Sequence, residues 1–223
     1  MNKKIVVMES VYERNEKEAR FFETILANKK IFCVNVLGSP GVGKTTCLIN
    51  IIKKIDEPCY VIEGDIESEI DTLKLREHGI SATQINTGGE CHLDAATVKK
   101  SFLNAAEFAD WGCGGGFLFI ENIGNLVCPA GFWLGENVKM LVCSVTDGSD
   151  KPYKYPLAFE KSDVVLINKT DLKNYVDFDY DYFCDGVKKL NTSAAVFDVS
   201  GKNGTGFKKV AKWLLNKAVP CEG

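Results

Sequence analysis

The sequence predicts an α/β fold, a doubly wound and mostly parallel sheet of the P-loop NTPase type. Short β-branched and aromatic runs alternate with stretches of helical spacing, which is the pattern of parallel strands joined by helical crossovers. A glycine-rich segment that ends in Gly43-Lys44-Thr45 stands between the first such run and the helical stretch after it. We therefore expect a sheet that is covered by helices on both faces.

The predicted strands are short apolar runs at residues 31–37, 60–62, 83–85, 117–120, 140–145, 164–167 and 195–199. Helical spacing is found between them at residues 44–55, 93–108 and 207–215. No linker rich in proline or serine and no repeat divides the chain, so we expect residues 1–223 to form one domain.

A leading helix is predicted at about residues 11–28. Tyr12, Ala19, Phe22 and Leu26 lie on nearly one face of it. We expect this face to pack on the outside of the sheet.

Composition and charge exclude several classes of function. The chain carries 27 basic and 30 acidic residues, a formal charge of −3, so it lacks the basic excess that nucleic-acid binding needs. The N-terminus does not have the form of a signal peptide, and Glu121 and Asn168 interrupt the longest apolar stretches. We expect a cytoplasmic protein that binds neither nucleic acid nor membrane.

Nine cysteines without a CxxC pair argue against a disulfide framework. Cys33, Cys59 and Cys143 lie within apolar runs, where a free thiol behaves as a small hydrophobic group. We expect these three in the core. Cys91 and Cys128 have different surroundings.

The segment from Gly38 to Thr45 matches the phosphate-binding pattern GxxxxGK(S/T). Its glycines allow backbone N–H groups to surround phosphate, and the helix that follows adds partial positive charge. Lys44 would neutralise the β- and γ-phosphate oxygens, and Thr45 would bind Mg²⁺. The residues predicted to contact the nucleotide here are Gly41, Val42, Gly43, Lys44, Thr45 and Thr46.

The segment Asn168-Lys169-Thr170-Asp171 follows a predicted buried strand. At that place Asp171 would accept hydrogen bonds from the N1–H and N2–H₂ groups of guanine, which adenine does not present together. A carboxylate left unpaired by adenine discriminates against it. The pattern therefore predicts binding of GTP and GDP through Asn168, Lys169 and Asp171.

The segment Ser200-Gly201-Lys202 follows the last predicted strand. It is either a loop that contacts guanine through Ser200 and Lys202 or a plain turn, and the residues alone favour neither.

Two acidic residues end predicted strands, Asp65 after the second and Glu121 after the fourth. Ligands of doubly wound sheets bind at the carboxyl ends of the strands. We expect Asp65 and Glu121, with Thr45, to bind Mg²⁺, and we predict Lys44, Asp65 and Glu121 as the catalytic residues. The alternative for each acid is a surface position.

Cys91 and His92 are adjacent, and Cys128 follows Glu121 by seven residues. Thiolate and imidazole groups suit Ni²⁺, Zn²⁺ or copper rather than Mg²⁺. Spacing alone leaves a metal site and an incidental grouping equally open. The sequence does not decide whether a metal site would also include Cys113, Cys143, Cys184 or Cys221.

Three long blocks of the chain are informative together, residues 84–95, with Asn86-Thr87-Gly88-Gly89-Glu90-Cys91-His92, residues 120–130, with Cys128-Pro129, and residues 144–156. These blocks resemble HypB, the family of hydrogenase nickel-incorporation GTPases. With Asp65, Asp71, the phosphate loop and the Asn168–Asp171 segment, the resemblance runs from about residue 32 to 213.

The resemblance implies a GTPase of the SIMIBI class that dimerises with GTP and binds metal at the dimer interface. By matching position, Cys91, His92 and Cys128 of each subunit would be the ligands of Ni²⁺ or Zn²⁺. Lys151 is a candidate for reaching the nucleotide across the interface, and a solvent-exposed loop lysine is the alternative. The implied partners are a HypA-like nickel chaperone and the large subunit of a [NiFe]-hydrogenase.

The chain also departs from the family pattern. Residues 1–28 contain no cysteine or histidine, so we expect neither nickel storage nor a second high-affinity site. Lys74 stands where relatives commonly have arginine, so we expect any fork-shaped contact there to be weakened.

Two other functions remain open at this point. A urease accessory GTPase would carry a Cys-Pro-His triplet, but Cys128-Pro129 is followed by Ala130. A nucleotide-regulated metal-binding scaffold would bind GTP with little turnover.

Overall fold

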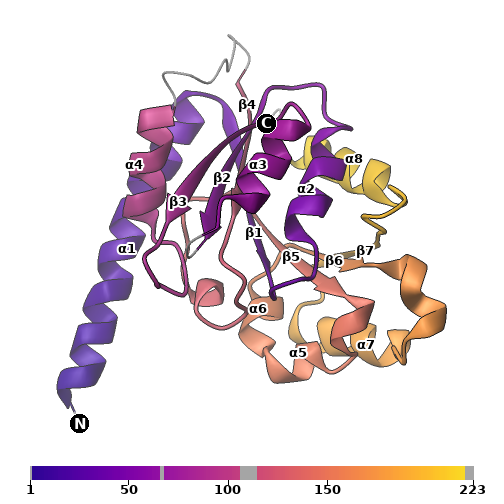
Figure 1. Cartoon of the computed structure of the whole chain (residues 1–223). Coiled ribbons are helices and arrows are strands. Elements are labelled where there is room, and N and C mark those ends of the chain that lie inside the picture. The colour runs from indigo at the N-terminus through magenta and orange to yellow at the C-terminus, as the bar shows by residue number, and fades with distance from the viewer. Residues whose placement is uncertain (1, 66–67, 106–114, 219–223) are drawn as a thin grey trace.

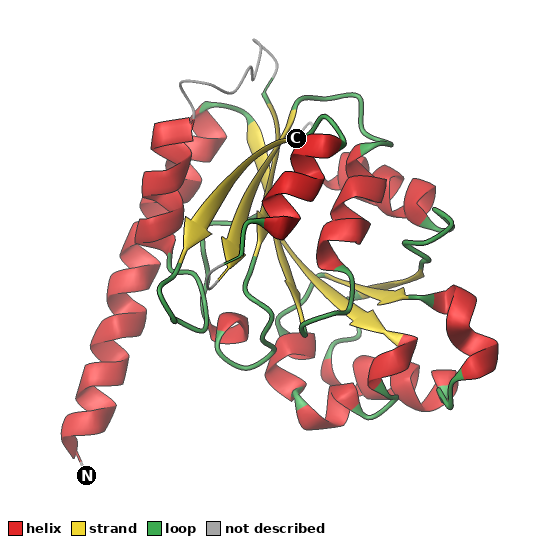
Figure 2. Ribbon diagram, in the orientation of Figure 1, coloured by secondary structure: helices red, strands yellow, loops and turns green. Residues whose placement is uncertain are grey.

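The computed structural model describes residues 2–65, 68–105 and 115–218, with no side-chain detail before residue 11. Its described strands form a seven-stranded sheet in the order β3-β2-β4-β1-β5-β6-β7 (Figures 1 and 2). Every strand pairing in this sheet is parallel. The strands are β1 (Ile31–Gly38), β2 (Cys59–Asp65), β3 (Ser81–Asn86), β4 (Gly116–Glu121), β5 (Val138–Ser144), β6 (Val164–Asn168) and β7 (Ala195–Asp198).

The predicted α/β class and the parallel sheet are confirmed, and each predicted strand is present. Helices join successive strands and cover both faces of the sheet (Figure 2). They are α1 (Asn2–Asn28), α2 (Lys44–Ile52), α3 (Ile70–Glu77), α4 (Ala95–Ala105), α5 (Lys151–Lys154), α6 (Pro156–Glu160), α7 (Tyr180–Leu190) and α8 (Phe207–Ala218). The predicted continuation of α4 to residue 108 lies outside the described residues.

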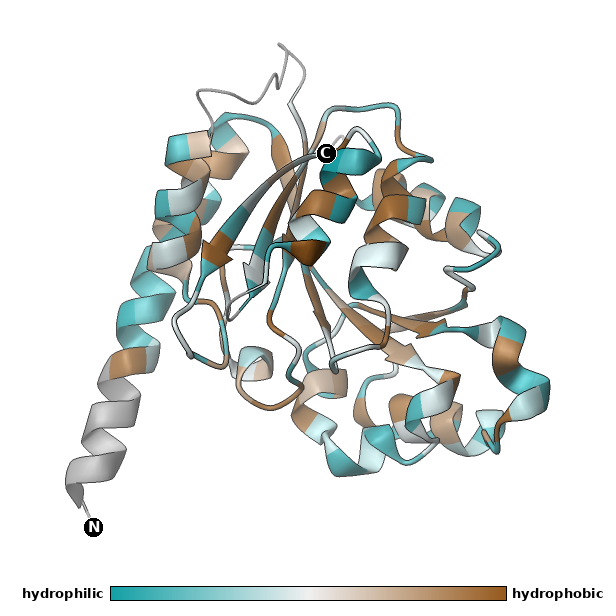
Figure 3. Ribbon diagram, viewed as in Figure 1, coloured by the Kyte–Doolittle hydropathy of each residue, from teal (hydrophilic) through white to brown (hydrophobic). Residues whose placement is uncertain are grey.

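Alternating residues of the strands separate the core into layers. Val34 and Val36 of β1 point to the layer beneath α2, α3 and α8, whereas Cys33 and Leu37 point to the opposite face. On that opposite face α1 and α4 cover β2, β3 and β4, while α6 and α7 cover β5 and β6. Figure 3 shows the resulting pattern, with hydrophobic strands inside and hydrophilic outer helix surfaces.

Helix α1 begins at Asn2, nine residues before the predicted start at residue 11. No glycine or proline interrupts the sequence from Asn2 to Asn28, so the helix continues. Ala19, Phe22 and Leu26 are buried as predicted.

Tyr12 contradicts the predicted packing face because its side chain is 42% exposed. The N-terminal part of α1 extends beyond the sheet (Figure 1), and helical spacing alone does not put Tyr12 over a strand. Its ring instead contacts Phe132, with 4.9 Å between the ring centroids.

Cys33 and Cys143 are buried as predicted, and burial raises the pKa of both thiols. Cys59 is only half-buried, because it begins β2 at the end of the sheet, and its Sγ donates to the Glu57 carbonyl. Cys184 is half-buried on α7. Cys113 and Cys221 lie outside the described residues.

None of the helices in the described ranges combines the length and hydrophobicity required to cross a bilayer.

The packing of α1 predicts different effects for two adjacent phenylalanines. Phe22 is fully buried, so Phe22→Ala should lower the free energy of unfolding by about 3–5 kcal/mol. Phe21 is 58% exposed and contacts Lys99, so Phe21→Ala should cost below about 1 kcal/mol. Urea unfolding of both variants measures the difference, and equal losses would contradict the described packing.

Candidate nucleotide and metal sites

The phosphate loop joins the end of β1 to the start of α2. Gly43 precedes the helix with a φ of 92°, and a Cβ there would lie 2.7 Å from Asn168 Nδ2. Only glycine combines this left-handed conformation with the close approach. The first N–H groups of α2 have no partner within the helix and are available to an anion at the loop.

Lys44 and Thr45 begin α2, and both side chains are buried. The Thr45 hydroxyl donates to Glu121 Oε1 at 2.9 Å. The other carboxylate oxygen, Glu121 Oε2, is buried without a hydrogen-bond partner among the described residues. A buried carboxylate oxygen in this position indicates room for a further cationic or polar partner.

A second buried carboxylate lies next to Glu121. The parallel pairing of β2 with β4 places Glu63 directly opposite Glu121, and Glu63 is 3% exposed. Burial raises the pKa of Glu63 to about 8, with a further increase from the charge of Glu121. Burial also raises the pKa of Glu121 to about 7, although Lys44 and the Thr45 hydrogen bond oppose this shift.

These groups line a cavity of about 310 Å³ beside the phosphate loop. Asp65, at the end of β2, and Asp71, in the first turn of α3, also line it. The carboxylate oxygens of this lining suit a hard cation such as Mg²⁺, and the unpartnered Glu121 Oε2 fits the same requirement.

Glu63 was not predicted as a residue of this site. A signal was present, because an acidic residue interrupts an apolar strand two positions before Asp65 and so shares its side of the strand. Lys74 contacts the phosphate loop, because its Nζ donates to Thr46 Oγ1 at 2.9 Å. A lysine makes this contact through a single ammonium group, whereas an arginine would offer the two parallel N–H donors of its guanidinium group.

Asn168 connects the phosphate loop to the turn after β7. Its Nδ2 donates to the Val42 carbonyl at 2.8 Å, and its Oδ1 accepts from the Gly201 N–H at 2.9 Å. Lys169 adds a contact from its Nζ to the Gly41 carbonyl at 2.7 Å. The predicted base-binding residues are thus fixed to the phosphate loop.

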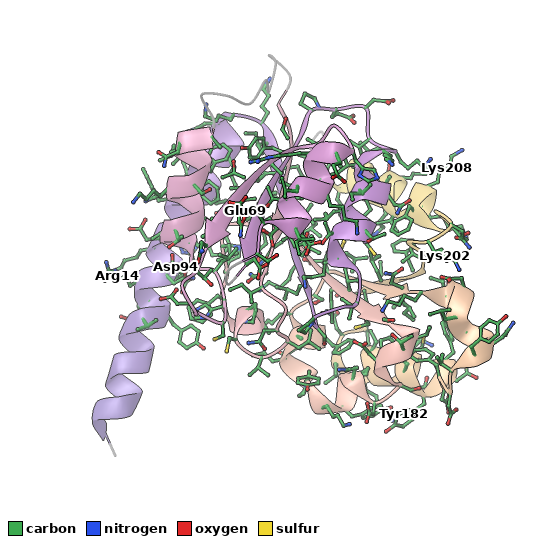
Figure 4. All side chains as sticks on the ribbon, in the orientation of Figure 1. Arg14, Glu69, Asp94, Tyr182, Lys202 and Lys208 are labelled. Atoms are coloured by element: carbon green, nitrogen blue, oxygen red, sulfur yellow. The ribbon has the colours of Figure 1, made fainter. Side chains whose placement is uncertain are left out.

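Asp171 lies against the turn at residues 200–202. The Ser200 hydroxyl, which is buried, donates to Asp171 Oδ1 at 2.5 Å and so orients the carboxylate. Lys202, labelled in Figure 4, is exposed on the surface. Of the two alternatives for this turn, its position beside Asp171 and Asn168 favours the base-contacting loop.

Lys151 is the first residue of α5 rather than a residue of an open loop. Its Nζ lies 3.9 Å from Asp147 Oδ2 and 5.2 Å from the centre of the Tyr155 ring. The side chain is 18% exposed, so it does not extend freely into solvent.

Cys91, His92 and Cys128 come together from two loops at the carboxyl edge of the sheet. Their ligand atoms all lie within 4.8 Å of one another. Cys91 Sγ is 3.6 Å from His92 Nδ1, and the neighbouring Cys128 thiol raises the pKa of Cys91. Cys91 is exposed, whereas His92 and Cys128 are half-buried.

The His92 ring is held by Phe132, with 4.0 Å between the ring centroids. Two sulfurs and an imidazole nitrogen are the ligands that Zn²⁺ and Ni²⁺ accept. Three ligands leave a four-coordinate site incomplete, and the exposed Cys91 places it at the surface.

The nucleotide-binding domain model described as CobW/HypB/UreG matches residues 32–198. Over 212 residues the chain is 38% identical to the hydrogenase maturation factor HypB of Azotobacter chroococcum mcd 1, covering 94% of this chain and 68% of that protein. It is 34% identical over 220 residues to the hydrogenase/urease maturation factor HypB of Helicobacter pylori, covering 96% and 88%.

A solved structure has the same fold. The crystal structure of HypB from Helicobacter pylori in complex with nickel matches with a TM-score of 0.87 and 33% identity, covering 92% of this chain and 95% of that one. The predicted P-loop NTPase fold is therefore confirmed.

The buried carboxyl groups of Glu63 and Glu121 predict how the stability of the protein depends on pH when neither nucleotide nor Mg²⁺ is bound. The folded state keeps protons on Glu63 and Glu121 that the unfolded chain releases above about pH 4.5, so the free energy of unfolding should fall from pH 5 to pH 8. Glu63→Gln should reduce this slope and raise stability at pH 8 by about 2 kcal/mol, with little effect at pH 5.

Urea unfolding at both pH values measures the effect. The control is Glu160→Gln, whose side chain is 54% exposed, and it should leave the slope unchanged. A Glu63→Gln slope equal to that of the parent would contradict the assignment of the buried protons.

Proposed function

Because this chain belongs to the HypB hydrogenase maturation factors of the CobW/HypB/UreG family, we propose that it hydrolyses GTP to control delivery of nickel to a [NiFe]-hydrogenase. The observation that carries the proposal is the placement of two sites on one short segment. Glu121 contacts Thr45 of the phosphate loop, and Cys128, seven residues later, belongs to the thiol and imidazole cluster.

Guanine recognition is proposed to come from Asp171. Its carboxylate is held by Ser200, while Asn168 and Lys169 hold the adjoining backbone against the phosphate loop. A carboxylate oriented in this way accepts the two adjacent donors of guanine and would remain unpaired opposite adenine.

Hydrolysis is proposed to depend on Lys44, Thr45, Asp65 and Glu121. Lys44 would neutralise phosphate charge from its buried position. Mg²⁺, when bound, supplies positive charge beside the phosphates. The oxygen donors to hold it would come from Thr45, Asp65 and Glu121. The Thr45 hydroxyl already donates a hydrogen bond to Glu121.

Nickel is proposed as the cargo of Cys91, His92 and Cys128. The cluster offers three ligands at the surface, so a second copy of the chain can complete the site. We propose that GTP favours this homodimer and that hydrolysis loosens it for release. A HypA-like nickel chaperone and the hydrogenase large subunit would be the partners, in the cytoplasm, with Lys151 a candidate contact across the interface.

The alternative function is a scaffold that binds nucleotide with little turnover. Release of phosphate from GTP well above the uncatalysed rate, and its loss in Lys44→Ala, would support the proposed enzyme. Tight GTP binding without phosphate release would support the scaffold.

The guanine assignment predicts altered base selectivity in Asp171→Asn. The amide replaces one acceptor by a donor, so GTP affinity should fall at least about tenfold, and affinity for xanthosine triphosphate should rise relative to GTP. Titration of both nucleotides measures this. Asp177→Asn, at an exposed position nearby, is the control and should bind GTP normally. Unchanged GTP affinity in Asp171→Asn would remove the guanine assignment.

The shared metal site predicts linked dimerisation. In sedimentation, the GTP analogue together with Ni²⁺ should give more dimer than each of three other conditions. These are the analogue alone, Ni²⁺ alone, and GDP together with Ni²⁺. Cys91→Ala and Cys128→Ala should each lose this effect and weaken nickel binding by at least about tenfold. Cys184→Ala, which removes a half-buried thiol outside the cluster, should behave as the parent. Nickel binding by both ligand variants at the parent's affinity would refute the shared site.

A further inference from the structure

Asn125 lies on the segment between Glu121 and Cys128 and contacts three separate parts of the chain. Its backbone forms an antiparallel bridge with Gly38, where β1 enters the phosphate loop. Its side-chain Nδ2 donates to the Cys91 carbonyl at 3.3 Å. Its Oδ1 accepts from the N–H of Val127, the residue before Cys128, at 2.9 Å. One asparagine thus reaches the phosphate loop and both thiol-bearing loops.

The segment around Asn125 packs directly on the phosphate loop. A Cβ added at Gly124 would lie 2.9 Å from Pro40 Cγ and 3.1 Å from its backbone, so there is no free space between the two. Close-packed segments move together rather than independently. A shift of Pro40 or Gly38 when phosphate binds is therefore transmitted to residues 124 and 125.

Asn122, near the start of the same segment, is fixed by several hydrogen bonds. It is 1% exposed, and its Oδ1 accepts from the N–H groups of Leu93 and Ile123 while its Nδ2 donates to Asn35. These contacts hold the loop after His92 to the end of β4. Asn125 is only half-buried, and its Nδ2 ends on the carbonyl of the metal ligand itself.

We propose that Asn125 is a positioning residue that aligns Cys91 with Cys128 according to the state of the phosphate loop. Its amide N–H group sets the backbone of Cys91, and its carbonyl oxygen sets the turn that presents Cys128. The bridge to Gly38 couples both to the nucleotide. The proposal rests on the proposed nickel function and identifies the residue through which nucleotide regulates the metal site.

Nickel affinity in two nucleotide states tests the proposal. The dissociation constant for Ni²⁺ is measured by competition with a chelator, with GDP and with a GTP analogue. The parent should bind nickel more tightly with the analogue, by at least about fivefold. The ratio of the Ni²⁺ dissociation constant with GDP to that with the analogue measures the coupling. In Asn125→Ala this ratio should fall to within about twofold of one, while the affinity for the analogue itself stays within about threefold of the parent.

Two further variants separate positioning from a general effect on the loops. Asn125→Asp keeps the acceptor for Val127 but loses the donor to Cys91, so its ratio should also fall toward one. This nearly isosteric variant keeps the test valid if the alanine variant unfolds. Asn86→Ala is the matched control, because the exposed Asn86 makes the same kind of turn, to the Gly88 N–H, in the loop that carries Cys91. Its ratio should equal that of the parent.

The absorption of the nickel–thiolate bond gives a second measurement. Exchange of GDP for the analogue should change this absorption in the parent and in Asn86→Ala, but not in either Asn125 variant. Asn125 variants that keep the parent's ratio, or that weaken nickel binding equally in both nucleotide states, would overturn the role of Asn125 alone. Equal nickel affinities in the two states of the parent would overturn both the proposed coupling and this inference.

Discussion

Parallel strands end at one edge of a sheet, and every site of this protein depends on that constraint. The phosphate loop follows β1, Asp65 ends β2, and Glu121 ends β4. The pairing of β1 with β4 places Val36 opposite Glu121, so the first turn of α2 can reach that carboxylate through Thr45. The loop after β6, which carries Lys169 and Asp171, and the two thiol-bearing loops after β3 and β4 lie at the same edge. Loops at this edge contact one another across a single intervening strand, since the loops after β3 and β4 meet at the end of β2 and those after β1 and β6 meet at the end of β5.

The buried carboxylates show how such an edge is prepared for a charged ligand. Glu63 and Glu121 are withdrawn from water, and Lys44 is a buried positive charge near Glu121. Without a bound cation the protein favours the neutral form of these acids. Folding thus buries two carboxyl groups whose ionised form is costly in an empty site and would be stabilised by a bound cation, which is a common cost of ligand-binding sites.

Much of this arrangement could be predicted from the sequence because the informative residues stand at strand ends. Glycines and Lys44 after one apolar run, Asp171 after another, and Asp65 and Glu121 at two more are locally recognisable. Contacts that depend on strand register were not predictable in the same way. Glu63 faces Glu121 only because β2 pairs with β4 in one register. Tyr12 was misplaced because helical periodicity does not reveal where the supporting sheet ends.

Spacing alone did not predict the cysteine and histidine cluster, and a family resemblance was needed as well. Cys91 and Cys128 are far apart in the chain. Their loops follow β3 and β4, which are separated in the sheet by β2 alone, so the two loops can meet beyond the end of β2. Hydrogen bonds that hold the cluster, such as that from Asn125 to the Cys91 carbonyl, involve backbone groups that every residue has. The sequence therefore contains no local sign of them.

The short segment from Glu121 to Cys128 also limits how such a protein can evolve. It is held at one end by β4, in the middle by the bridge between Asn125 and Gly38, and at the other end by the helical turn at Pro129–Gly131. An inserted or deleted residue would disturb the bridge to Gly38 at the phosphate loop and also move the Cys128 thiol out of register with its partner ligands. Substitutions can alter the two sites separately, whereas a change of length affects both, so this segment should accept new side chains far more readily than new lengths.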